Sequence, residues 1–133
     1  MDNKHTHLEL IQGIINRMGV NSFLLKGWTI TLVAALFALA QKESKSAYMF
    51  LAYFPAVVFW VLDGYYLWQE RLFRKLYDKV RKINESEIDF SMSTTSVSKE
   101  AGSFFDAIIS RTVLPFYGVV VIAILFVIFI TPK

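Results

Sequence analysis

The sequence has no cysteine and only two histidines among its 133 residues. Without cysteine the chain can form no disulfide, no thiolate nucleophile and no cysteine-ligated zinc or iron–sulfur centre. The histidines, His5 and His7, are too few to hold a metal ion in the absence of a recognisable third ligand. We therefore predict no metal site and interpret both histidines as part of a solvated N-terminal segment.

Motifs of catalysis are missing as well. No Gly-x-Ser-x-Gly elbow, glycine-rich phosphate loop or Walker pattern occurs in the chain. The acidic residues Glu85, Glu87 and Asp89 and the serines after them lie in a stretch without periodicity, which is typical of a solvated loop. We expect no catalytic residues and no cofactor, and predict that the protein is not an enzyme.

Hydrophobic residues, in contrast, make up 55% of the chain and gather in three long runs. A soluble domain of this size has too little interior to bury three such runs. A transmembrane helix needs about 20 apolar residues to cross ~30 Å of hydrocarbon. These runs predict an all-α membrane protein with three transmembrane helices, near residues 23–40, 47–68 and 113–131.

The second run continues into a basic amphipathic stretch, which predicts one long helix over 47–84. Pro55 should kink it mildly. Tyr65, Tyr66 and Trp68 mark the point where the helix leaves the membrane, because amphipathic rings favour the headgroup layer. The projecting part carries an apolar stripe that consists of Leu72, Leu76, Val80 and Ile83.

The same projecting part carries a group of basic residues: Arg71, Arg74, Lys75, Lys79, Arg81 and Lys82. Three interpretations stay open. The group could contact anionic lipid, at ~1 kcal/mol per charge. It could instead bind an anionic ligand such as a nucleotide, and we take all six as candidate ligand-binding residues. Nucleic acid is the third possibility, but the exposed aromatic residues that such binding uses are missing, so we predict no nucleic-acid partner.

Helix signals divide the rest of the chain. Residues 1–22 are predicted to form a separate amphipathic helix, with a capping box at Thr6 and Glu9 and a stop at Gly19 and Asn21. A transmembrane hairpin follows over 23–68. Residues 69–112 then form the basic helix, a loop and a short aromatic helix that Ser98 caps, and 113–133 form the third transmembrane helix.

The orientation follows from the lysines and arginines. Eight lie between the second and third runs, namely the six basic residues with Lys99 and Arg111, whereas the first loop carries Lys42 and Lys45 only. Because cytoplasmic loops are rich in these residues, we place the N-terminus and residues 69–112 in the cytoplasm and the C-terminus outside.

Two charges inside the apolar runs predict a pair. Lys26 lies fourteen residues before Ala40, and Asp63 lies sixteen after Ala47. On antiparallel helices joined by a short loop their depths differ by only ~3 Å. A charge within a membrane span needs a partner or an aqueous cavity. Lys26 and Asp63 therefore form either a pore-lining pair or a structural salt bridge near the cytoplasmic boundary.

Three stretches together resemble a group of small bacterial membrane proteins: HLELIQGIINRMGVNSFLLKGWTITLVAALFALA, FPAVVFWVLDGYYLWQERLFRKLYD and LPFYG. This group is associated with TIR-type proteins in antiphage defence of the Thoeris kind. The chain is also loosely similar to the SLATT effectors, which have two spans where this chain has three. The resemblance implies an effector of the bacterial inner membrane that a nucleotide signal from a TIR-type partner assembles or opens, so that the cell loses its membrane potential.

Three spans in 133 residues would line a pore only as a homo-oligomer with cyclic symmetry. The alternative is a non-conducting accessory or scaffold subunit that docks a cytoplasmic partner through the apolar stripe of the basic helix.

Overall fold

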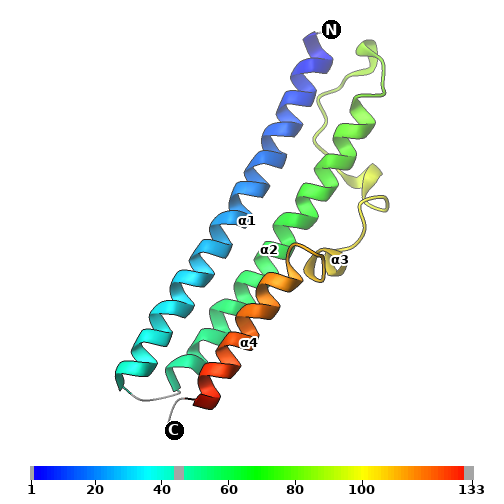
Figure 1. Ribbon diagram of the computed structural model, residues 1–133. Helices are drawn as coiled ribbons and strands as arrows, with labels where there is room; N and C mark the ends of the chain where they lie inside the picture. Colours follow the sequence, from blue (N-terminus) through cyan, green and yellow to red (C-terminus); the bar gives the residue numbers. More distant parts are fainter. Residues whose placement is uncertain (1, 44–46, 131–133) are drawn as a thin grey trace.

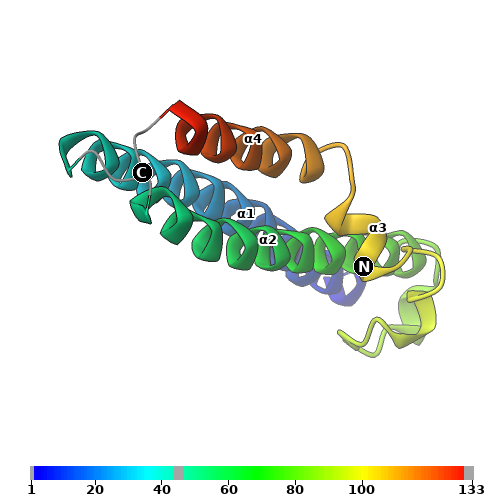
Figure 2. The same cartoon turned by 90° about the horizontal axis from the view of Figure 1, so that it is seen from below.

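The computed structural model describes residues 2–43 and 47–130, and these residues form helices and loops without a strand. Two long helices, α1 (Asp2–Glu43) and α2 (Ala47–Val80), run antiparallel along the whole molecule (Figure 1). Helix α4 (Leu114–Ile130) packs on one side of this pair at one end only (Figure 2). The prediction of an all-helical protein is confirmed.

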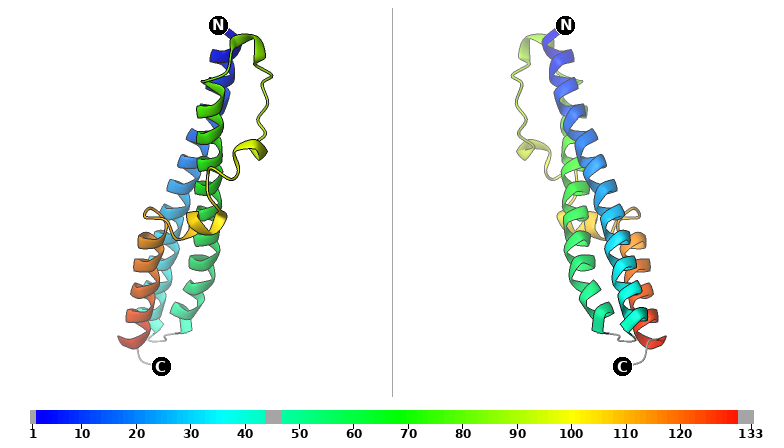
Figure 3. Two further views of the ribbon diagram at one scale, coloured as in Figure 1. Left: turned by 90° about the vertical axis from the view of Figure 1, so that its right-hand side faces the viewer. Right: turned by 90° about the vertical axis from the view of Figure 1, so that its left-hand side faces the viewer.

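Between α2 and α4 the chain returns along the projecting half of α2 (Figure 3). This connection contains two short 3-10 turns, η1 (Glu85–Glu87) and η2 (Thr95–Val97), and the five-residue helix α3 (Phe104–Ile108). Helix α3 lies against α2 at the level where α4 begins (Figure 1). The connection therefore covers one face of α2 from its end back to the middle of the molecule.

The N-terminal region corrects the sequence prediction, because α1 is one unbroken helix of 42 residues. The separate amphipathic helix predicted over 1–22 is wrong, because residues 2–22 belong to α1, and Thr6, Gly19 and Asn21 lie in the helix interior. A glycine inside a helix costs about 1 kcal/mol relative to alanine. Burial of Ile11 and Ile15 against α2 outweighs that cost and carries the helix past Gly19.

Helix α2 is continuous through Pro55 and ends at Val80, four residues before the predicted end. Its 34 residues span about 51 Å at 1.5 Å per residue. This is far more than the ~30 Å of a hydrocarbon core. The second apolar run and the basic stretch thus form one rigid rod, as predicted, and the rod is long enough to extend well beyond a membrane.

The buried residues form two clusters, one in each half of the molecule. The first joins α1, α2 and α4 and contains Ala40, Met49, Ala52, Ala56, Ile124, Val127 and Ile128. The second joins α1, α2 and η2 and contains Ile11, Ile15, Leu76, Val80 and Val97. We call these halves the apolar half and the projecting half.

The second cluster overturns one prediction about the apolar stripe of α2. Leu72, Leu76 and Val80 are only 3–4% exposed, because α1 and the returning connection cover them. Ile83 is half-buried. The stripe therefore supplies the interior of the projecting half and is not free to dock a partner.

Exposed apolar side chains are almost confined to the apolar half. Among the described residues, every large exposed hydrophobic side chain except Leu10 and Phe90 lies within residues 20–39, 50–65 or 105–130. In the most apolar 18-residue stretch of each helix, only 11% of the residues are buried in α1 and 28% in α2. Both helices are long and apolar enough to cross a membrane. Helix α4 is a shorter apolar helix. Neither long helix is thus covered as the core helix of a soluble protein would be.

Candidate functional site

Asp63 and Lys26 contact each other within the apolar half. The Asp63 side chain is fully buried, and its Oδ2 lies 2.5 Å from Lys26 Nζ. The Ser22 hydroxyl donates a hydrogen bond to Asp63 Oδ1 and accepts one of 2.8 Å from Lys26 Nζ. Ser22 and Lys26 share one face of α1 because residues four apart in a helix are neighbours. Both carboxylate oxygens of Asp63 are therefore satisfied by α1.

The sequence predicted the meeting of Lys26 and Asp63 but not the part of Ser22. The available signal was the four-residue spacing between Ser22 and Lys26, together with the need of a buried carboxylate for more than one donor.

Helix α4 closes the pair from one side with aromatic rings. Tyr117 is fully buried and stacks on Trp60 of α2, with ring centroids 6.0 Å apart. The Phe116 ring lies 5.8 Å from Lys26 Nζ, which is within cation–π range. The ion pair therefore lies where α1, α2 and α4 meet, and a shift of any of the three changes its surroundings.

Helix α3 is fitted closely to α2 beside this pair. Trp60 Nε1 donates a hydrogen bond of 3.0 Å to the Ile108 carbonyl oxygen. A Cβ at Gly64 would lie 2.6 Å from Ile108 Cγ1 and 3.2 Å from its Cα, so only glycine admits α3 at this distance. Gly64 directly follows Asp63, so α3 contacts α2 one residue from the buried carboxylate. Sequence analysis missed both Trp60 and Gly64, although a glycine inside a helix indicates a close approach.

Ser103, and not Ser98, caps α3. The Ser103 hydroxyl accepts a hydrogen bond of 3.2 Å from the Asp106 backbone, and Asp106 Oδ2 accepts one of 2.9 Å from the Ser103 backbone. The hydrogen bond from the Ser103 backbone, the nearby Ser103 hydroxyl and the charge of Arg71 lower the pKa of Asp106 below its usual value. This reciprocal cap fixes the start of α3 next to the first basic residue of α2.

Five of the six basic residues line two hollows of the projecting half, and Arg81 lines neither of them. The inner hollow is nearer the apolar half, has a volume of about 380 Å³ and is lined by Arg71, Arg74 and Lys75, with Asp78 and Ala101. The outer hollow has a volume of about 340 Å³ and is lined by Lys75, Asp78, Lys79 and Lys82 on one side and by Ser96, Val97 and Glu100 of the connection on the other. The returning connection thus turns a basic helix face into two recesses.

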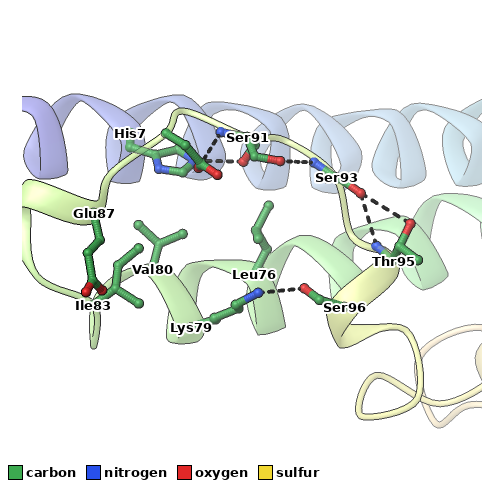
Figure 4. Close-up of a pocket in the computed structure, with 11 residues that line it drawn as sticks. His7, Leu76, Lys79, Val80, Ile83, Glu87, Ser91, Ser93, Thr95 and Ser96 are labelled. Carbon is green, nitrogen blue, oxygen red and sulfur yellow. Dashed lines mark hydrogen bonds between the residues drawn. The ribbon is translucent and has the colours of Figure 1, made fainter.

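Within the outer hollow, Lys79 of α2 contacts the returning connection. Lys79 Nζ donates a hydrogen bond of 2.8 Å to the Ser96 hydroxyl (Figure 4). Arg81 Nε lies 3.2 Å from Asp78 Oδ1. The hydrogen bond to Ser96 therefore positions the Lys79 side chain, whereas Arg81 forms an ion pair with Asp78.

His7 is not solvated, contrary to the prediction. It is 1% exposed, and its Nε2 lies 2.8 Å from the Ser91 carbonyl oxygen of the connection (Figure 4). Its ring packs on Phe90, whose φ is 57°. His5 is exposed, and its Nε2 lies 2.8 Å from Glu9 Oε1. Among the described residues no three candidate ligands come together as a metal site, and His7 serves instead to hold the connection against α1.

Comparison with family models, with curated proteins and with solved structures found no match for this chain. The resemblance to membrane effectors of antiphage defence therefore stays a hypothesis.

Proposed function

We propose that this protein is an oligomeric effector of the bacterial inner membrane, in which an anion bound by the projecting half controls the apolar half. The observation that carries this proposal is the continuity of α2. One unbroken helix connects Lys75 and Lys79 of the outer hollow to the buried Asp63. The sixteen residues from Asp63 to Lys79 cover about 24 Å. A tilt of the rod at one end is therefore transmitted to the other.

The membrane placement is part of the proposal. The apolar half, consisting of residues 23–43, 47–68 and α4, would cross the bilayer three times. The 17 residues of α4 cover about 26 Å, slightly less than the ~30 Å core, which a bilayer accommodates by local thinning. The excess of basic residues over 69–112 places the projecting half in the cytoplasm.

The ligand would bind in the outer hollow. Lys75, Lys79 and Lys82 provide positive charge for a phosphate or carboxylate, and Ser96 adds a hydroxyl. Since Ser96 belongs to the returning connection, a ligand there would join α2 to this connection, which leads through α3 to α4. A nucleotide from a TIR-type partner is the ligand that the family resemblance implies. Such a ligand shifts the state of the protein only by its difference in affinity for the two states.

Pore formation would require several copies. The exposed apolar faces of the three helices offer surface for lipid or for neighbouring subunits, and the Lys26–Asp63 pair would line the pore or hold the closed form near its cytoplasmic end. A non-conducting scaffold subunit is the alternative function. The burial of Leu72, Leu76 and Val80 removes the docking surface that favoured it.

Ion flux tests the proposal. We expect the purified protein, reconstituted in liposomes of phosphatidylethanolamine and phosphatidylglycerol, to release potassium when nucleotides from a mixed panel are added. Native mass spectrometry of the same sample should show an oligomer. The Lys79→Gln/Lys82→Gln variant should insert but not respond. A protein that stays monomeric in nanodiscs and conducts nothing with any nucleotide would contradict the effector function.

A further inference from the structure

The inner hollow lies at the depth of lipid headgroups if the aromatic residues around Trp68 mark the membrane boundary. Arg71 and Lys75 follow Trp68 by three and seven residues, or about 5 and 10 Å along the helix. Each headgroup layer is about 5–8 Å thick, and long basic side chains reach several ångströms along the helix to meet it. The outer hollow begins at the same lysine and extends away from the membrane.

An apolar surface lies directly beside this hollow. Helix α3 turns Phe104 toward Trp68, with ring centroids 5.9 Å apart, and Ile108 toward Gly64. Its opposite face is uncovered, since Phe105 is 74% and Ile109 is 61% exposed. A five-residue helix with two large apolar side chains in water would be costly, whereas the same face at the membrane boundary would rest on acyl chains.

The hollow and this face adjoin each other. Ala101, which lines the hollow, precedes the cap of α3 by two residues, and Asp106 of α3 is close enough to Arg71 for their charges to interact. Basic side chains thus lie over an exposed apolar patch on one continuous surface. An anionic phospholipid has a matching arrangement, with its phosphate at the membrane surface and its acyl chains deeper in the membrane.

The positive charge of the inner hollow is only partly neutralised by protein. Asp78 is engaged by Arg81 at 3.2 Å. Glu70 Oε2 lies 3.7 Å from Arg74 Nε, which is too long for a hydrogen bond. Two guanidinium groups on one face suit a phosphate, because each can donate two parallel hydrogen bonds.

We propose that the inner hollow and α3 form a binding site for one anionic phospholipid, with its phosphate on Arg71, Arg74 and Lys75 and its acyl chains against Phe105 and Ile109. The site rests on the membrane placement proposed above but is separate from the ligand site of the outer hollow. Bound lipid would fix α3 against α2, and so fix the cover of the Lys26–Asp63 pair.

Thermal unfolding in mild detergent tests this site. Phosphatidylglycerol, phosphatidylcholine and inorganic phosphate are added separately, and the midpoint of unfolding is measured. We expect phosphatidylglycerol to raise the midpoint more than phosphatidylcholine does, and phosphate to have no effect. The Arg71→Gln/Arg74→Gln variant should lose most of the phosphatidylglycerol effect, whereas Lys79→Gln/Lys82→Gln, with the same loss of charge in the same basic stretch, should keep it.

A second pair of variants examines the apolar part. Phe105→Ser/Ile109→Ser should weaken the retention of phosphatidylglycerol in native mass spectra, and Leu10→Ser, which changes an exposed apolar residue of the projecting half, should not. An equal effect of phosphate, or an equal loss in Lys79→Gln/Lys82→Gln, would overturn the lipid site and leave the effector function standing. A protein that alkaline carbonate extracts from membranes would overturn both.

Discussion

At the scale of single residues, the buried Asp63 is the most constrained group in the apolar half. Its two carboxylate oxygens are bound by Lys26 and Ser22, and its side chain is fully buried. A buried ion pair seldom adds net stability over apolar residues of similar size, but loss of one partner leaves an unpaired charge. The pair is therefore more a constraint on helix register than a source of stability.

Asp63→Ala should destabilise the protein by ~1–3 kcal/mol, since Lys26 is 24% exposed and would be left only partly solvated. Lys26→Met/Asp63→Leu, which removes both charges, should be less destabilised than Asp63→Ala. Thermal unfolding in detergent measures both, with Glu9→Ala as a control because the Glu9–His5 contact is exposed. A double variant no better than the single one would show that the charges do not act as a pair.

The cap of α3 should fail in acid. Hydrogen bonding with Ser103 lowers the pKa of Asp106 in the folded protein below 3.8. The ionised Asp106 therefore stabilises the fold fully above pH 3.8, and this stabilisation is lost as the pH falls through the lowered pKa. We expect the fluorescence of Trp68, which contacts Phe104, to change over that acidic range. Asp106→Asn should shift the signal at neutral pH and remove its pH dependence in acid. An unchanged acid transition in this variant would assign the titration to another group.

At the scale of elements, the position of α3 depends on Gly64, a glycine of α2. The close contact between Gly64 and Ile108, with the hydrogen bond from Trp60, fixes α3 between the basic part of α2 and the start of α4. A helix of five residues has no stability of its own, so these tertiary contacts determine where it lies.

Gly64→Ala should displace α3. The added Cβ would lie 2.6 Å from Ile108 Cγ1 and 3.2 Å from Ile108 Cα. The Cα can move away only if the backbone of α3 moves with it. We expect a lower unfolding midpoint and faster hydrogen exchange in residues 104–109. Gly13→Ala is the matched control, because nothing lies within 4 Å of its Cβ and alanine favours the helix by up to ~1 kcal/mol. If Gly64→Ala behaved like Gly13→Ala, the close contact would not matter to stability.

At the scale of the whole molecule, the chain consists of two halves with different interiors and different surfaces. The projecting half buries its own apolar stripe and exposes charge, whereas the apolar half leaves most of its apolar side chains uncovered. In the proposed membrane placement a bilayer would cover this surface, and lipid, the Lys26–Asp63 pair and α3 would meet at the boundary between the halves.

Cysteine labelling should show this arrangement in cells. The chain has no native cysteine, so single substitutions report one position each. We expect Glu43→Cys, at the end of α1 in the apolar half, to react with an impermeant maleimide in intact cells, and Ser98→Cys of the connection to react only after lysis. The opposite pattern would reverse the orientation, and reaction of both positions in intact cells would exclude the three-span topology.

Periodicity and spacing along the chain were sufficient for several of these features. The apolar runs determine that the chain is helical and that α2 continues into its basic part, because these properties depend on near neighbours and on helix geometry. The meeting of Lys26 and Asp63 also follows from counting, since a short loop between two antiparallel helices sets their relative depth.

Only the tertiary structure decided the rest. Whether Gly19 ends a helix depends on what Ile11 and Ile15 pack against, and the answer lies some sixty residues away in α2. The burial of His7, the coverage of the apolar stripe and the division of the basic residues into two hollows all come from the path of the connection, which carries no periodic signal. Local preferences are a few tenths to about 1 kcal/mol per residue, so long-range packing determines such features.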